Sequence, residues 1–190
     1  MKYDLTPRMF VRASYERALR IPTFYQFFGN GASILSNVEL RPETSDNYNL
    51  GWAYRRRSGG KVRYRIEVNG FLRGQNDIIY LTNDQFQRYR NSEEVRTVGL
   101  EGEFTFSVWD RLQFTGNITR LRATYESIEA ANTSAQFLVG TTFPNIPSLF
   151  STARLSYELK DLIQADDHFQ LYVQHKFVDE FKYINVGKVY

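Results

Sequence analysis

The chain has 190 residues, of which 42% are apolar and 16% aromatic, and a formal net charge of +3. With 24 basic and 21 acidic residues, this charge is too balanced to indicate a nucleic-acid partner. The absence of cysteine excludes disulfide frameworks and thiolate metal sites. No window holds 18 consecutive apolar residues, so no transmembrane helix is predicted, but barrel strands average out as hydrophilic and such a scan misses them.

Seven segments alternate apolar and polar residues with a period of two, which predicts β-strands. In chain order they cover residues 11–15, 48–54, 61–73, 98–108, 112–119, 153–160 and 169–177. In the clearest segment, 61–73, Val62, Ile66 and Val68 share one face and Arg63 and Glu67 share the other. A tilted strand of about 9–11 residues crosses a bilayer core, and several of these segments are that long. The predicted fold class is all-β, an antiparallel meander of about seven long strands.

The connections between these strands alternate in length. Short turns are predicted at 58–60, 109–110 and 161–167, and long connections at 22–44, 81–95 and 126–146. Outer-membrane barrels have short periplasmic turns and long extracellular loops. A soluble β-sandwich is the alternative, since its strands also alternate, but those strands are usually about 5–6 residues long. No helix is predicted anywhere in the chain.

Residues 11–51 resemble the late barrel region of TonB-dependent outer-membrane receptors. The run Leu19-Arg20-Ile21-Pro22 is similar to the family's Phe-Arg-Ala-Pro element, with Leu and Ile in place of the commoner Phe and Ala. A second element at the family's spacing follows between Asn37 and Gly51. Gly99-Leu100-Glu101 resembles the family's Gly-x-Glu element on a later, descending strand, so the similarity covers nearly the whole chain. The family-motif residues, expected to be structural, are Arg20, Pro22, Asn37, Leu40, Pro42, Glu43, Tyr48, Gly51, Gly99 and Glu101.

The resemblance implies an architecture and a set of partners. Residues 1–190 are expected to form part of a 22-stranded transmembrane β-barrel, without the plug, the early strands and the closing C-terminal strands. The implied location is the outer membrane of a Gram-negative-type bacterium, in contact with outer-membrane lipid. The implied protein partners are the remainder of the barrel, the plug and, through the plug, TonB. No cofactor is expected. The chain start lacks the apolar core of a signal peptide, so either the export signal lies upstream of this stretch or the membrane interpretation is wrong.

The function that the resemblance implies is TonB-dependent uptake of a scarce nutrient, the family's substrates being siderophore-iron, haem, cobalamin or glycans. One alternative is a passive porin-like barrel, which predicts that the parent protein lacks a plug. Another is a soluble β-rich carbohydrate-binding module, which predicts folding without detergent.

Nothing in the sequence predicts catalysis or a metal site. The chain has only two histidines, so no Ser/His/Asp set is available. His168 and His175 are seven residues apart, on opposite faces of a continuous strand, so they cannot chelate one metal together. The protein is therefore not expected to be an enzyme.

Two groups of side chains are candidates for ligand contact. The acidic pair Glu101 and Glu103 shares a strand face and could project into the barrel lumen. The alternatives are a salt-bridged lumen wall, which polar barrel interiors often show, and contact with a substrate. The basic residues expected beside this pair are Arg63, Arg65 and Arg73.

The second group is a cluster of aromatic residues in the first long connection: Phe24, Tyr25, Phe27 and Phe28. Large rigid side chains on exposed loops suit ligand binding. The alternative is packing against neighbouring loops or the membrane interface, where aromatic residues form girdles.

Overall fold

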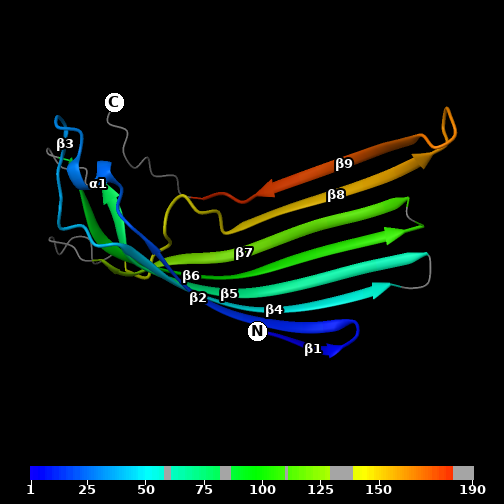
Figure 1. Cartoon of the computed structure of the whole chain (residues 1–190), viewed down its shortest axis with the longest axis horizontal. Helices are drawn as coiled ribbons and strands as arrows, with labels where there is room; N and C mark the ends of the chain where they lie inside the picture. The colour runs from blue at the N-terminus through cyan, green and yellow to red at the C-terminus, as the bar shows by residue number, and fades with distance from the viewer. Residues whose placement is uncertain (58–60, 82–86, 110, 129–138, 182–190) are drawn as a thin grey trace.

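The computed structural model describes residues 1–57, 61–81, 87–109, 111–128 and 139–181. They form one antiparallel sheet, in which each strand of the order β1-β2-β4-β5-β6-β7-β8-β9 pairs with the next, and β3 pairs with β6 in parallel (Figure 1). The elements are β1 Lys2–Thr6, β2 Met9–Arg20, α1 Phe24–Phe28, β3 Ile34–Leu35, β4 Glu43–Arg57, β5 Val62–Leu81, β6 Gln87–Val108, β7 Leu112–Ile128, β8 Leu149–Lys160 and β9 His168–Val178.

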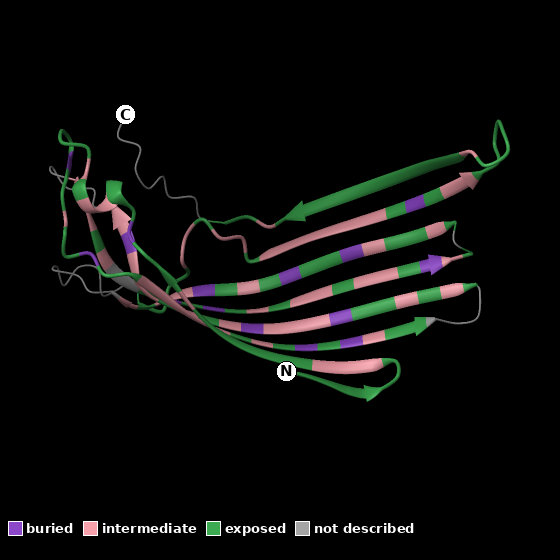
Figure 2. Cartoon of the chain, viewed as in Figure 1, coloured by how far each residue is buried: buried purple, intermediate pink, exposed green. Residues whose placement is uncertain are grey.

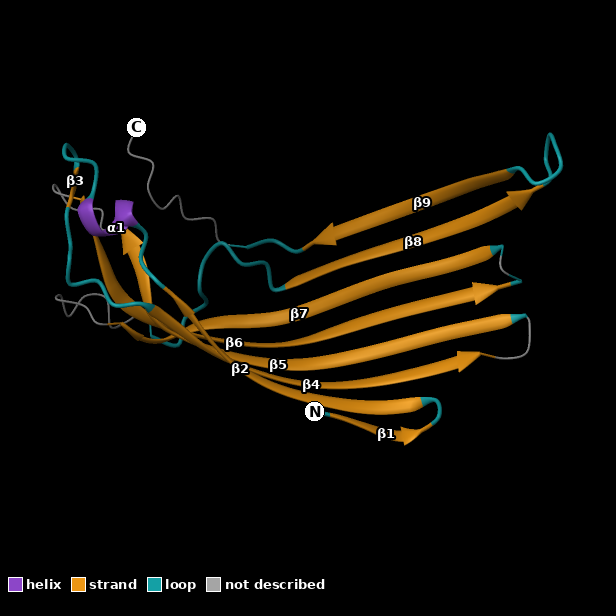
Figure 3. Ribbon diagram, in the orientation of Figure 1, coloured by secondary structure: helices purple, strands orange, loops and turns teal. Residues whose placement is uncertain are grey.

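The two ends of the sheet differ in their connections. The β1–β2 turn and the β8–β9 turn lie at one end, and α1 and β3 lie at the other (Figure 3). We call these the short-turn end and the long-loop end. At the long-loop end β5 and β6, with 20 and 22 residues, extend beyond the shorter strands β8 and β9, with 12 and 11 residues.

The register gives the sheet two chemically different faces, because residues paired directly across antiparallel strands project to the same side. We call these the apolar face and the polar face. The apolar face includes Val11, Ala13, Tyr15, Tyr48, Leu50, Trp52, Ile66, Val68, Leu72, Val98, Leu100, Phe104, Phe106, Phe114, Ile118, Leu155, Tyr157, Phe169, Leu171 and Val173. The polar face includes Arg12, Asn49, Arg65, Glu67, Asn69, Glu101, Glu103, Thr105, Thr115, Asn117, Thr119, Thr152, Arg154, Gln170, Gln174 and Lys176.

The apolar residues form a band that crosses the strands obliquely. One row of paired residues runs from Tyr15 through Tyr48, Leu72 and Val98 to Arg122, so the band has ended where this row reaches β7. At the short-turn end, the row from Val62 to Leu171 is apolar on every strand from β5 to β9. Barrel strands tilt by about 35–45° from the membrane normal, so an apolar slab meets each successive strand at a shifted position. The oblique band therefore fits a membrane-spanning wall.

Two aromatic rings cover glycines on the neighbouring strand. Phe71 on the polar face lies over Gly99, where an added Cβ would come within 2.2 Å of the ring. On the apolar face Phe104 covers Gly116 in the same way, with 2.4 Å to such a Cβ. Glycine weakens a strand because it offers no side chain to pack, and a ring laid across it restores contact.

Few side chains are buried, because the described residues form a single layer. Ala53 and Phe71 are 2% and 6% exposed, whereas Leu100 and Val173 on the apolar face are 56% and 74% exposed. Figure 2 shows the same alternation along the central strands, and β9 is exposed over its whole length. None of the described helices has the length and apolar character needed to span a membrane.

The seven predicted strands are confirmed as β2, β4, β5, β6, β7, β8 and β9. The prediction of no helix is wrong at α1, where Thr23 and Gln26 form a capping box that holds a single helical turn. The long connection predicted at 81–95 is also wrong, since β6 already begins at Gln87. Beyond the apolar band both faces become polar, so alternation no longer reveals the strand. The predicted turn residues 58–60 and 110 and part of the last long connection, 129–138, lie outside the described residues.

Candidate functional site

An ion cluster centred on Glu67 occupies the middle of the polar face. Arg65 Nε donates to Glu67 Oε1 at 2.7 Å and Arg65 Nη2 lies 2.6 Å from the same oxygen. Arg55 on the adjacent strand β4 and Arg12 on β2 approach the carboxylate, at 3.7 Å and 4.0 Å. The Glu67 side chain is only 9% exposed, while the three guanidinium groups remain about half exposed, so the buried negative charge is compensated from three sides.

Gly51 makes this cluster possible. It pairs with Arg12 across β2 and β4, and an added Cβ would lie 2.7 Å from Arg12 Nε and 3.2 Å from Asn69 Oδ1. A side chain at this position would therefore displace the arginine from the path that leads to Glu67. This contact gives the family-motif residue Gly51 a structural role.

A small hollow of about 250 Å³ adjoins the cluster. Glu101 and Glu103 line it together with Asn117 and Thr119 of the next strand. The predicted projection of both acids from one face is confirmed, and the register shows which residues lie directly opposite them. Glu103 lies opposite Glu67 and Glu101 opposite Asn69, whose Nδ2 donates at 3.5 Å.

The three basic residues expected beside that acidic pair share its face, and Arg65 is diagonal to Glu103, but none of the three lies directly opposite either acid. Arg65 binds Glu67 on its own strand, and Arg73 lies over the Phe71 ring with 4.9 Å to the centroid. Arg63 pairs with Ser107, two positions nearer the short-turn end than Arg65. The strand period predicts a shared face correctly, but it does not predict which residues become opposite neighbours, because that depends on register.

At the long-loop end, Arg20 and Glu43 join β2 to β4. Arg20 Nε donates to Glu43 Oε2 at 2.7 Å, and Arg20 Nη2 binds the other oxygen, Oε1, which also accepts from the Ile79 N–H at 2.7 Å. Ile79 follows a β-bulge at which the β5–β6 register shifts, and the carboxylate satisfies its amide. Partial burial opposes the charged form, but the hydrogen bonds from Arg20 and Ile79 outweigh it and lower the pKa of Glu43.

Two asparagines fasten the first long connection to this end of the sheet. Asn37 Nδ2 donates to the Tyr89 carbonyl at 2.8 Å, and the Asn37 amide donates to Phe27 O at 2.7 Å. Asn91 Nδ2 donates to the carbonyls of Arg41 and Asp77, while Asn91 Oδ1 accepts from the Arg41 amide at 2.8 Å. These contacts hold residues 37–41 against the bulge.

The aromatic residues of α1 are placed at the long-loop end and remain exposed. Phe24, Tyr25 and Phe28 are 79%, 46% and 50% exposed, and Phe24 packs on Phe28 with 4.5 Å between centroids. Tyr25 meets the edge of Tyr89 at 6.2 Å. Burial raises the pKa of Tyr89, and the neighbouring Tyr25 adds to the rise. Most of the aromatic side chains of α1 are therefore exposed.

A cavity of about 690 Å³ opens beside these rings and was not predicted from the sequence. One wall of the cavity is formed by the long-loop ends of β5 and β6, with Tyr80 and Tyr89. The opposite wall is formed by Tyr125 of β7 and residues 143–146. Tyr125 packs on Phe143 at 5.1 Å, and that segment pairs with β7 through bonds such as Phe143 N to Ala123 O. The only signal in the sequence is the presence of tyrosines beyond the apolar part of each strand.

No cluster of three or more His, Cys, Asp or Glu side chains that could hold a metal ion occurs within the described ranges. His168 and His175 pair with Lys160 and Ala153, which puts them on opposite faces as expected. His168 Nδ1 lies 2.7 Å from Glu158 Oε1 on the polar face.

The comparisons with known proteins agree with this architecture. Among solved structures the chain is similar to the copper transporter OprC, with a TM-score of 0.59 and 17% sequence identity, over 91% of this chain and 29% of that one. At this identity the likeness shows the fold alone, and the chain spans less than a third of that protein. No curated protein matches the sequence. The family model for the TonB-dependent receptor-like β-barrel matches residues 1–190. The chain therefore belongs to the TonB-dependent receptor β-barrel family.

Proposed function

We propose that this chain forms a section of the barrel wall of an outer-membrane receptor that takes up a scarce nutrient in a TonB-dependent manner. The observation that supports this most directly is the two-faced sheet, with an oblique apolar band on one side and ion clusters on the other. A wall of this kind separates lipid from a polar lumen. The long-loop end would face the exterior and the short-turn end the periplasm.

The aromatic cavity at the long-loop end is the proposed first contact for the nutrient. Its volume of about 690 Å³ falls within the range of small-molecule sites, which are concave and mostly apolar with a few polar groups. Tyr80, Tyr89 and Tyr125 can supply both ring faces and hydroxyl groups. We include the exposed α1 rings Phe24 and Tyr25 as part of the same entrance, and Phe27 and Phe28 as their support.

The polar face is proposed to line the passage below that entrance. Arg65 is engaged with Glu67, and the acids proposed for contact with a ligand are Glu101 and Glu103, which line the small hollow. The remainder of the barrel and the plug are the expected protein partners, with TonB acting through the plug. We expect no enzymatic activity. The substrate class stays open among the family's nutrients, and nothing in the described residues favours the copper named for OprC.

The test uses the full-length parent receptor in a bacterium from which its own gene has been deleted. Growth and uptake would be measured on a panel of siderophore-iron complexes, haem, cobalamin and glycans, in strains with and without TonB. We expect one class to be taken up only when both the receptor and TonB are present. Equal uptake without TonB would overturn the proposal in favour of a passive channel.

A pair of variants locates the entrance within that experiment. The double variant Tyr89→Ala/Tyr125→Ala removes two rings of the cavity, and we expect weaker ligand binding by about tenfold or more, because a buried aromatic anchor contributes about 2 kcal/mol. The matched control Tyr157→Ala/Tyr172→Ala removes two rings from β8 and β9, far from the cavity, and should leave the affinity unchanged.

A further inference from the structure

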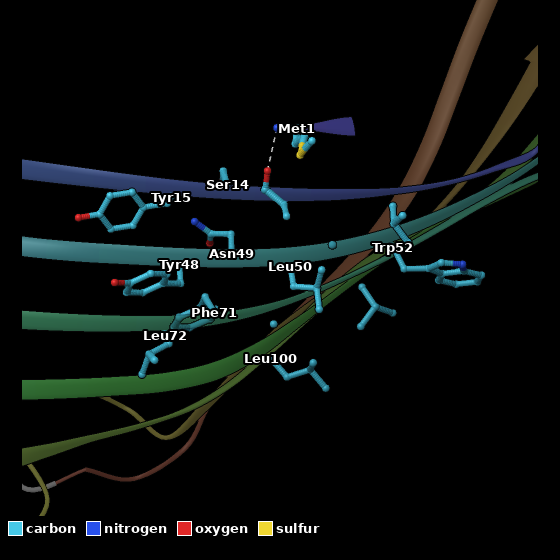
Figure 4. Close-up of a pocket in the computed structure, with 15 residues that line it drawn as sticks. Met1, Ser14, Tyr15, Tyr48, Asn49, Leu50, Trp52, Phe71, Leu72 and Leu100 are labelled. Carbon is cyan, nitrogen blue, oxygen red and sulfur yellow. Dashed lines mark hydrogen bonds between the residues drawn. The ribbon is translucent and has the colours of Figure 1, made fainter. Parts of the chain in front are cut away.

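The apolar face carries a groove of about 1000 Å³ at the middle of β4, β5 and β6, on the long-loop side of the apolar band. Leu50, Leu72 and Leu100 project around it from three successive strands (Figure 4). Gly70 lies between Leu50 and Leu100 in the same row, and an added Cβ there would meet only the Leu50 carbonyl oxygen, at 3.9 Å. The missing side chain at Gly70 therefore leaves a channel in an otherwise continuous apolar surface.

Two exposed arginines stand at the β7 border of this groove. Arg120 pairs directly with Leu100, which lines the groove, and Arg122 pairs with Val98. Residues two apart on a strand lie about 7 Å apart on one face, so the two guanidinium groups can engage one phosphate or two adjacent ones. No ion pair to either arginine exists among residues 1–57, 61–81, 87–109, 111–128 and 139–181.

A third cation extends the pair onto β6. Arg96 is diagonal to Arg122 across the β6–β7 ladder and half exposed. Arg96 forms an ion pair with Glu126 at 3.9 Å, on the side farther from the apolar band. Along β7, this face of the sheet is therefore apolar at Ile118 and cationic at Arg120 and Arg122. It carries both charges farther toward the long-loop end.

An apolar groove with a cationic border is complementary to a molecule that has an apolar chain and an anionic head group. Apolar chains occupy the membrane core and anionic phosphates mark its boundary, where basic side chains attract them. Long arginine stems also lie along apolar surface while the charge reaches the boundary. We propose that this surface binds a phosphorylated lipid of the outer leaflet, with its phosphate groups on Arg120 and Arg122 and an acyl chain in the groove over Gly70.

The test uses the full-length receptor, purified in detergent, and lipid A, a phosphorylated glycolipid with several acyl chains. Native mass spectrometry would compare binding of lipid A with binding of the same lipid after enzymatic removal of its phosphates. We expect wild-type receptor to prefer the phosphorylated form. Arg120→Gln/Arg122→Gln should lose about tenfold or more of that affinity and keep only the binding common to both forms.

Two further variants separate the charges from the groove. Gly70→Val fills the channel, and it should weaken binding of both forms of the lipid while preserving the preference for phosphate. Arg154→Gln/Lys176→Gln removes the same charge from the polar face and should bind as wild type does. Heat-modifiable electrophoretic mobility would identify folded barrels, and Arg120→Lys/Arg122→Lys, which keeps the charge, should retain most of the affinity.

Several results would overturn the assignment. They are equal binding of the two lipid forms by wild type, unchanged binding after Arg120→Gln/Arg122→Gln in a folded barrel, or an equal loss in the polar-face control. The inference depends on the proposed membrane location and not on the transported nutrient. A receptor that took up no nutrient but still selected phosphorylated lipid would count against the proposed uptake and support this site.

Discussion

Glu43 accepts hydrogen bonds from Arg20 on the adjacent strand β2 and from the backbone amide of Ile79 on β5, the adjacent strand on the other side. One carboxylate therefore ties together β2, β4 and the bulged part of β5. Its motif neighbours act on the same region, since Asn37 and the buried Leu40 hold the first long connection in place. In this chain the motif Asn-x-x-Leu-x-Pro-Glu therefore anchors the first long connection to the sheet.

Replacing Glu43 by Gln should loosen this corner. The variant keeps the shape but removes the charge that pairs with Arg20, and a hydrogen bond to a charged group contributes about 1.5–3 kcal/mol when it is well made. Because Arg20 is half exposed, we expect about 1 kcal/mol of local destabilisation. Hydrogen exchange of the peptide containing Ile79, followed by mass spectrometry on the full-length receptor, measures it. Asp4→Asn, which breaks an exposed pair with Lys2, is the control and should leave this peptide unchanged.

Asn91→Ala should free residues 37–41 from the sheet without unfolding the wall. The substitution removes two donated bonds and one accepted bond, and it leaves the carbonyls of Arg41 and Asp77 without that donor. Limited proteolysis of intact cells should then cleave the first long connection several-fold faster. Asn49→Ala on the polar face of β4 is the control, and equal cleavage in both variants would contradict the assigned role.

The sequence predicted the wall more completely than the site. Alternation located all seven long strands, because each has one face in an apolar environment and the period of two follows from that. It failed at the long-loop end, where Gln75, Asn76 and Asp77 on β5 are polar regardless of face and the bulge shifts the register.

The candidate site depends on relationships that a single sequence does not contain. Glu67 was assigned to the polar face, but its three arginine partners come from three different strands and meet only in one register. The cavity between Tyr89 and Tyr125 brings together residues 36 positions apart. The aromatic residues of α1 were predicted to form a cluster in a loop, but the contact of Tyr25 with Tyr89 was not predicted.

Glu67→Gln should destabilise the wall more than Glu103→Gln, although the two residues face each other across β5 and β6. Removing the carboxylate leaves three guanidinium groups close together without their shared partner. The arginines are about half exposed, so we expect about 1–2 kcal/mol, less than for a fully buried pair. Urea unfolding of the full-length receptor in lipid vesicles measures the difference. A larger loss in Glu103→Gln would show that the cluster is centred elsewhere.

The β8–β9 turn should weaken in acid. The Asp167 carboxylate accepts from the amides of Ile163, Leu162 and Gln164, and these bonds lower its pKa. Because the pKa of this carboxyl group is lower in the folded turn than in the unfolded chain, the ionised carboxylate stabilises the turn at a pH above its ordinary pKa. This stabilisation is lost as the pH falls through the lowered pKa. The amide shift of ¹⁵N-labelled Ile163 should follow that titration. Asp167→Asn should abolish it, whereas Asp166→Asn, whose side chain makes no hydrogen bond in the described residues, should preserve it.

Gly99→Ala should destabilise the wall because the added Cβ would lie 2.2 Å from the Phe71 ring. Crowding of this kind in a packed site costs about 1–3 kcal/mol, and here the ring must leave the strand surface that it covers. The control is Gly74→Ala, at a position on β5 where an added Cβ would meet nothing within 4 Å, and it should be neutral or slightly stabilising. Adding Phe71→Leu to Gly99→Ala should recover part of the loss, since the shorter side chain makes room for the methyl group. Urea unfolding of the wild type, Gly99→Ala, Phe71→Leu and the double variant gives a coupling energy between positions 71 and 99, and a value near zero would mean that the ring and the glycine are independent.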